Sequence, residues 1–164
     1  AGDRRIVVIG SQAILGQFPD APAALLASME ADVFPLSRPE RTDLIDGAIG
    51  EGSRFHERFG YYAQGVSEKT ALLPSGWKRR LVRVRNANTG GVEGLCLEAH
   101  DLAISKYVAG REKDLAFTAT LARHRLTSKR TLLERLARTR LAPRMRRLVE
   151  GRIGRDFPRT QRGS

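Results

Sequence analysis

Ile6-Val-Val-Ile-Gly10 begins the stretch that decides the fold, and Glu30-Ala-Asp-Val33 ends it. The first segment is short, rich in β-branched residues and closed by a glycine. It therefore predicts a buried strand that ends in a sharp turn. The second segment is stopped by Pro35, and it predicts another strand over Glu30–Phe34. The rest of the chain can be placed around these two strands.

Glu30 and Asp32 lie two residues apart in the second predicted strand. Because side chains alternate between the two faces of a strand, both carboxylates project to the same side. Two neighbouring acids at the end of a buried sheet are costly unless a positive charge lies between them, and a divalent cation such as Mg²⁺ fits that place. The alternative is a solvated strand face, which any acid-x-acid triplet can form.

The turn Gly10-Ser11 can bind phosphate. Glycine lets a phosphate approach the backbone, Ser11 adds a hydroxyl donor, and a following helix presents free N–H groups to anions. We expect that helix over residues 12–29, broken near Pro19 and Pro22. The alternative is that Gly-Ser simply starts a helix.

The combination of these features resembles the DNA-polymerase-β-type nucleotidyltransferase superfamily, in which a Gly-Ser turn is followed by a strand bearing paired acids. A second block, Lys106-Tyr-Val-Ala-Gly-Arg-Glu-Lys-Asp114, resembles the AbiEii-like branch and its bacterial relatives. The resemblance covers roughly residues 4–125. It implies an α/β (α+β) fold, with a small mixed sheet and a C-terminal helical lobe.

The resemblance also implies an activity. A magnesium-dependent enzyme of this kind binds a nucleoside triphosphate and transfers a nucleotidyl group to RNA, with tRNA as one candidate, or to a protein. Gly10 and Ser11 would hold the triphosphate, and Glu30 and Asp32 would be the catalytic metal ligands. The AbiEii-like branch further implies a toxin with a protein antitoxin as its partner.

The resemblance further implies that Lys106 and Lys113 line the nucleotide site, where a lysine binds a phosphate as a point charge. They are seven residues apart, so on the single helix expected from about Ala99 to His124 they share one face. Gly110 is a candidate interruption of that helix. The alternative is an exposed, salt-bridged helix in which acids balance the lysines.

The resemblance also implies a third carboxylate on a later strand that faces the acid pair. The strand predicted over Tyr61–Val66 offers only Gln64, and an amide cannot serve as a base. Glu68 and Glu93 are the substitutes in the sequence. The gap supports a second hypothesis, a catalytically inactive binding protein that keeps the fold.

The net charge of +11 is unevenly distributed. Residues 121–164 hold fourteen basic and three acidic residues, whereas residues 1–120 are neutral overall. Such asymmetry favours contact with a polyanion, and it supports a third hypothesis, a basic RNA-binding protein. Arg144, Arg146 and Arg147 are the candidate nucleic-acid contacts. The alternative is an arginine-rich coding bias that produces a merely solvated surface.

The whole sequence suggests three parts: a sheet domain over 1–97, a helix over 98–126 that packs on it, and a basic helical extension over 127–164. Further strands are expected over Leu81–Arg85 and Val92–Leu97, with Asn86–Gly91 as a turn. The single cysteine, Cys96, is expected to fill the core, and it suits a reducing cytoplasm. No run of eighteen apolar residues exists, so no membrane contact is expected.

Overall fold

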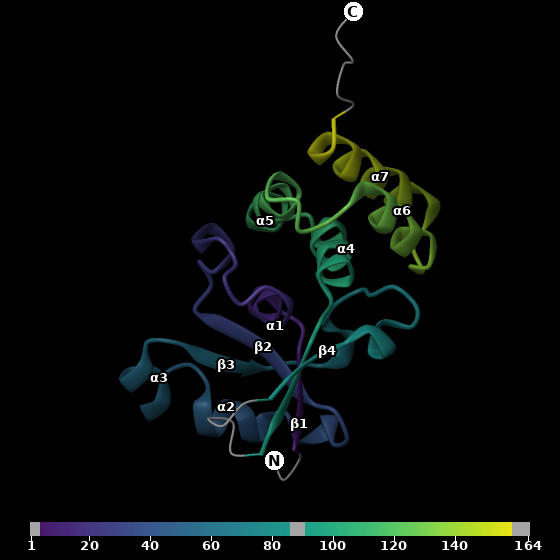
Figure 1. The fold of residues 1–164 in the computed structure, drawn as a ribbon. Coiled ribbons are helices and arrows are strands. Elements are labelled where there is room, and N and C mark those ends of the chain that lie inside the picture. The colour runs from purple at the N-terminus through teal and green to yellow at the C-terminus, as the bar shows by residue number, and fades with distance from the viewer. Residues whose placement is uncertain (1–3, 86–90, 159–164) are drawn as a thin grey trace, which may run out of the picture.

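The computed structural model describes residues 4–85 and 91–158, and its centre is a mixed sheet of five strands (Figure 1). The order across the sheet is β3-β2-β1-β5-β4. β1 pairs with β5 in parallel and with β2 antiparallel, β3 lies parallel to β2, and β4 lies antiparallel to β5. The strands are β1 (Arg5–Val8), β2 (Glu30–Pro35), β3 (Tyr62–Gly65), β4 (Val82–Val84) and β5 (Glu93–Cys96).

The helices cover both faces of this sheet. Figure 1 shows α2 and α3 below it and α4 to α7, coloured green to yellow, above it. The helices are α1 (Ile14–Gln17), α2 (Asp43–Ile49), α3 (Arg54–Phe59), α4 (Ala99–Ala109), α5 (Glu112–Arg123), α6 (Lys129–Ala137) and α7 (Pro143–Asp156). Short 3₁₀ turns are η1 (Ser11–Ala13), η2 (Ala23–Leu25), η3 (Pro39–Arg41), η4 (Glu68–Thr70) and η5 (Trp77–Arg80). The mixed α/β fold predicted from the sequence is confirmed.

The alternation along β2 sorts its side chains between two cores. Phe34 joins the large core above the sheet, whereas Val33 packs with Ala63 and Ile45 in a small core beneath it. Since Glu30 and Asp32 are in phase with Phe34, they face the same side as the large core. At their end of β2 that side is hollow, as described below.

The expected long helix is two helices. α4 ends at Gly110, which adopts φ +66°, and α5 begins two residues later. Glycine suits this position because a left-handed residue commonly ends a helix and glycine adopts that conformation without strain. Lys106 therefore lies on α4 and Lys113 on α5. The prediction that they share one face of one helix is wrong.

The C-terminal helices belong to the core of the sheet. Leu132 and Leu136 of α6, with Val149 and Ile153 of α7, are fully or almost fully buried in the same cluster as Val7 of β1. Residues of all three predicted parts thus share one hydrophobic core. Burial of such side chains stabilises a fold by about 1.5–3 kcal/mol each, so the last two helices contribute to the stability of the sheet domain.

Another local prediction differs from the structure. The helix expected over residues 12–29 is reduced to η1, α1 and η2, because the prolines at 19 and 22 stop it early. The turn predicted over Asn86–Gly91 lies mostly outside the described residues. Each helix within residues 4–85 and 91–158 is too short or too polar to cross a lipid bilayer.

Candidate active site

The two carboxylates of β2 lie side by side, as their spacing predicts. In the parallel pair with β3, Glu30 is opposite Tyr62 and Asp32 is opposite Gln64. Burial raises the pKa of Glu30, and the charge of Asp32 and a hydrogen bond with it raise it further. The pair is therefore electrostatically strained in the absence of a cation.

The Gly-Ser turn lies directly against Asp32. The backbone N–H of Ile9 donates to the carbonyl of Asp32 at 2.9 Å. A Cβ built on Gly10 would lie 2.5 Å from Oδ2 of Asp32, so only glycine fits between the turn and the carboxylate. Ser11 begins the 3₁₀ turn that follows. Turn and acid pair thus form one continuous surface.

A cavity of about 680 Å³ opens over this surface. It brings together five of the six residues predicted to form the nucleotide and metal site. These are Ser11, Glu30, Asp32, Lys106 and Lys113. The sixth, Gly10, lines an adjoining cavity of about 220 Å³ together with Asp32 and Lys106. Tertiary folding has gathered these residues from β2, the Gly-Ser turn, α4 and α5.

Lys106 is held inside the cavity and is not solvated on an open helix face. Its side chain is 12% exposed, and its Nζ lies 3.4 Å from Oδ1 of Asp114. Its ammonium group also lies 5.8 Å from the ring centroid of Phe117, within the range of a cation–π contact. Lys113 is exposed at the rim, and its charge acts to lower the pKa of Glu30.

Asp114 organises the basic side of the cavity. Its side chain is 1% exposed and accepts hydrogen bonds from Nε of Arg111 at 2.7 Å and from Nη2 at 3.2 Å. Burial alone would raise its pKa, but the hydrogen bonds from Arg111 and the charge of Lys106 hold the pKa below the ordinary value. One buried acid thus orients two cations toward the cavity.

Arg111 is a site residue that the sequence predictions did not include. It lines both cavities. Its pKa is raised by the hydrogen bond to Asp114, and the charges of Asp32 and Glu30 add to this effect. Gly110 could have pointed to Arg111 in the sequence. If a helix ends at Gly110 beside the expected nucleotide, the next residue, Arg111, lies at the site.

Gln64 occupies the position where the third carboxylate was expected. It lies beside Asp32 in the sheet register and lines the same cavity. The two substitutes lie elsewhere: Glu68 forms an ion pair with Lys78 at 2.8 Å, and Glu93 lies opposite Arg5 at the far end of β1. Glu51 is the other carboxylate whose charge raises the pKa of Glu30. Sequence reasoning did not consider it.

The acid pair fits a magnesium ion in part. Within the described residues, no group of three or more His, Cys, Asp or Glu side chains is arranged to hold a metal. Glu30 and Asp32 nevertheless present oxygen ligands on one side of β2, and neither forms an ion pair with a described basic side chain. Mg²⁺ usually takes one or two carboxylates and completes its shell with phosphate oxygens and water.

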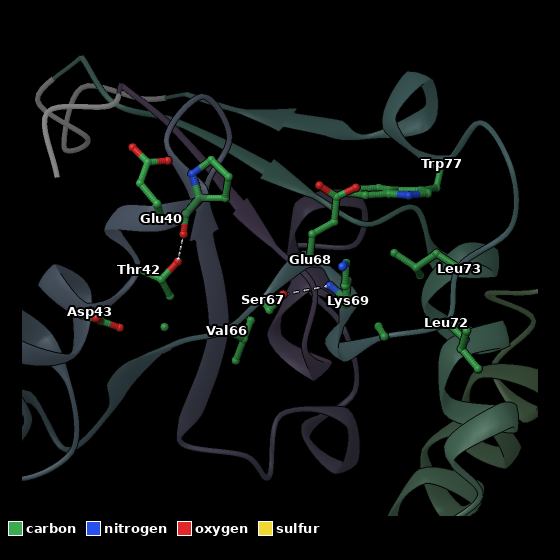
Figure 2. A pocket seen from close by; sticks show the side chains of 13 residues that line it. Glu40, Thr42, Asp43, Val66, Ser67, Glu68, Lys69, Leu72, Leu73 and Trp77 are labelled. Atoms are coloured by element: carbon green, nitrogen blue, oxygen red, sulfur yellow. Dashed lines mark hydrogen bonds between the residues drawn. The ribbon is translucent and has the colours of Figure 1, made fainter.

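A second, larger groove borders the active-site cavity. Figure 2 shows it between Glu40 and Asp43 on one side and Trp77 on the other, with Ser67 and Lys69 on its floor. Its volume is about 810 Å³. Val66, Ala71 and Leu72 line both this groove and the cavities over the acid pair. The groove is therefore continuous with the cavities over the acid pair.

The three arginines predicted to contact nucleic acid have different environments. Arg144 and Arg147 are exposed on α7. Arg146 instead donates from Nη1 to the carbonyl of Leu136 at 2.6 Å and from Nη2 to the carbonyl of Thr139 at 2.8 Å, so it caps the end of α6. The prediction that all three guanidinium groups face a ligand needs this correction.

Cys96 and His100 have structural contacts. Cys96 is buried, as expected, and burial raises the pKa of its thiol to about 11. His100 accepts a hydrogen bond from the backbone N–H of Ser128 and contacts Glu98, which caps α4. These contacts connect the start of α4 to the start of α6.

Comparison with known proteins agrees with the geometry. A family model described as "Nucleotidyltransferase of unknown function (DUF6036)" matches residues 2–136. That range contains the Gly-Ser turn, the acid pair and the Lys106–Asp114 block. No curated protein and no solved structure matches the chain. Because the match covers most of the sequence, the chain belongs to this family of nucleotidyltransferases of unknown function.

Proposed function

We propose that the protein binds a nucleoside triphosphate with Mg²⁺ in the 680 Å³ cavity and transfers a nucleotidyl group to an acceptor hydroxyl. The observation that carries the proposal is that Glu30 and Asp32, which form no ion pair within the described residues, line the same cavity as Lys106 and Arg111. The acids suit a metal, and the cations suit phosphates. Phosphoryl chemistry of this kind depends mostly on positioning and on charge neutralisation.

In this reaction the acceptor oxygen forms a bond to the α-phosphorus. The bond from that phosphorus to the bridging oxygen breaks, and pyrophosphate leaves with the electron pair while the hydroxyl proton passes to solvent. Glu30 and Asp32 would hold the metal, which would neutralise charge on the phosphate oxygens. Gly10 and Ser11 approach the triphosphate, and Lys106, Arg111 and Lys113 compensate its charge.

The acceptor is RNA, with tRNA as one candidate, or a protein. Exposed Arg144 and Arg147 support the RNA assignment, since arginines on a surface bind the phosphate backbone. By resemblance to the AbiEii-like branch, the protein acts as a toxin that a partner antitoxin neutralises. Growth arrest on expression of the wild type, and its loss in Glu30→Gln, tests this role.

A second function is favoured by Gln64. Without a third carboxylate at the position of Gln64 on β3, the protein binds nucleotide and does not turn it over, since an amide neither takes the acceptor proton nor adds a charged ligand. The two functions share the binding step and differ in the transfer step.

Thermal-shift measurements with a nucleoside triphosphate, with and without Mg²⁺, test the binding step. We expect stabilisation of the wild type only when both are present, and no such effect in Glu30→Gln or Asp32→Asn. Asp20→Asn, on an exposed turn, is the matched control. Unfolding of both site variants would show that the acids are structural and would contradict the proposal.

Transfer of label from an α-phosphate-radiolabelled triphosphate to total RNA or to protein then tests the second step. Label transfer by the wild type that is lost in Glu30→Gln supports the proposed enzymatic activity. Magnesium-dependent nucleotide binding without transfer to either acceptor supports the binding protein.

A further inference from the structure

A basic hollow lies between the loop that contains η5 and the C-terminal end of α6. It has a volume of about 380 Å³ and is lined by Ser75, Gly76, Arg79, Arg80 and Arg138. These lining residues include three arginines and no acid. Such a charge pattern is unfavourable unless an anion binds, because like charges within a few ångström repel one another.

Arg80, one of the arginines that line the hollow, is paired with a buried acid, Asp101. Asp101 is completely buried and accepts hydrogen bonds from Nε of Arg80 at 2.7 Å and from Nη2 at 3.0 Å. Nε of Arg135 lies 3.2 Å from Oδ1, the same oxygen that accepts from Nη2 of Arg80. One carboxylate thus faces two guanidinium groups, and the charge of nearby Glu98 also acts on it. The side chains of Arg79 and Arg138 add two positive charges, and neither forms an ion pair with an acid in the described part of the chain.

The donors are held in place before any ligand arrives. Nη2 of Arg80 donates to the carbonyl of Ser75 at 3.1 Å, and the backbone N–H of Ser75 donates to the carbonyl of Arg138 at 2.9 Å. Nη1 of Arg80 points at Gly76, where a Cβ would lie 3.1 Å from it. Gly76 has φ +76°, so glycine is favoured here for its backbone as well as for the space.

We infer that this hollow is a phosphate-binding site separate from the nucleotide cavity. A planar guanidinium group that is fixed by a buried acid presents its remaining N–H groups to phosphate oxygens without loss of side-chain entropy. Asp101 and Lys106 are five residues apart on α4, or about 140° around the helix, so the two sites lie on different sides of it. The phosphate belongs either to a free anion or to the backbone of an RNA strand.

The inference does not depend on nucleotidyl transfer. The variant Arg79→Ala/Arg138→Ala removes the two unpartnered charges and leaves the contacts of Arg80 with Asp101 in place. The control Arg54→Ala/Arg58→Ala removes the same charge from exposed positions on α3. Equal melting temperatures confirm that neither variant unfolds. Thermal shifts with triphosphate and Mg²⁺ then report on the nucleotide cavity separately.

Titration with inorganic phosphate tests whether the hollow binds a free anion. The amide NMR signals of Ser75 and Gly76 report the binding. Titration with a short oligouridylate at several salt concentrations tests whether the hollow binds the backbone of an RNA strand. We expect Arg79→Ala/Arg138→Ala to weaken binding about tenfold and to reduce the salt slope for the strand by about 1.4, or about 0.7 for each charge. Arg79→Lys/Arg138→Lys should keep the slope, because it keeps both charges.

The two titrations distinguish the sources. If both phosphate and oligouridylate change the NMR signals, and Arg79→Ala/Arg138→Ala removes both changes, the hollow binds any phosphate group. A response to the oligonucleotide alone identifies the backbone of a strand. An equal loss in the α3 control, or an unchanged affinity and slope in Arg79→Ala/Arg138→Ala, overturns the inference.

Discussion

Gly10 and Asp32 are in such close contact that a Cβ at position 10 would meet Oδ2 of Asp32 at 2.5 Å. The two residues come from different elements, a turn after β1 and the middle of β2, yet they form one surface. The contact explains why a glycine precedes Ser11. It also couples the position proposed to hold phosphate to the position proposed to hold metal.

Gly10→Ala should destabilise the fold by about 1–3 kcal/mol, the usual cost of overpacking, and should weaken magnesium-dependent triphosphate binding by displacing Asp32. Gly47→Ala is the matched control, because its Cβ would meet no atom within 4 Å. Chemical denaturation and thermal shift measure both effects. The second change Asp32→Ala should restore the stability of Gly10→Ala. If Asp32→Ala did not restore stability, the Cβ at position 10 would not be clashing with the Asp32 side chain.

Glu30→Gln should become more stable relative to the wild type as the pH rises. The pKa of Glu30 is raised above its ordinary value of 4.5, so the folded state holds the proton more tightly than the unfolded state. The stabilisation from Glu30 is therefore fully present below pH 4.5 and is lost as the pH rises through the folded pKa.

Denaturation midpoints of both proteins across that pH range, with and without Mg²⁺, measure this difference. Added Mg²⁺ should reverse the order at neutral pH, since the ion relieves the repulsion only where both acids are present. Glu150→Gln, exposed on α7, should show neither effect. Parallel pH profiles for the wild type and Glu30→Gln would contradict the electrostatic coupling of Glu30 with Asp32.

Lys106→Ala should weaken binding of a triphosphate by about 1.5–3 kcal/mol, the usual contribution of a hydrogen bond to a charged group. Binding of the unphosphorylated nucleoside should change much less, because a lysine acts on phosphate as a point charge. Calorimetric titration of both ligands measures the difference, with exposed Lys129→Ala as the control. Equal losses for both ligands would exclude a phosphate contact.

Asp114→Asn should cost about 3 kcal/mol of stability, as expected when a buried ionic contact loses one partner. It should also weaken triphosphate binding, since Arg111 and Lys106 are no longer oriented. Glu134→Gln is the control: its pair with Arg130 is exposed, and its loss should cost less than about 1 kcal/mol. If the two variants were equally stable by urea denaturation, Asp114 would not organise the site.

Gln64→Glu should place a third carboxylate beside Asp32. We expect it to lower the melting temperature in metal-free buffer, because three acids repel one another, and to strengthen the stabilisation by Mg²⁺. Gln64→Ala removes the amide without adding charge and serves as the control. If Gln64→Glu left the response to Mg²⁺ unchanged, Gln64 would not occupy a metal-ligand position.

The sequence by itself determined the local features of the site. Alternation placed Glu30 and Asp32 on one side of β2, a glycine closed the turn before Ser11, and Gly110 was recognised as a candidate interruption of the long helix. Periodicity and turn preferences act over a few residues, so they can be read from neighbouring positions.

Only the tertiary structure decided which of these features meet. Strand register placed Gln64 beside Asp32, and the break at Gly110 aimed Arg111 at the cavity and buried Asp114 behind it. The structure also placed Arg146 in hydrogen bonds with backbone carbonyls and Arg135 in an ion pair with buried Asp101, although both charges look free in the sequence. Such pairings join residues far apart in the chain, and the free energy that selects them comes from burial and long-range register, which no local pattern encodes.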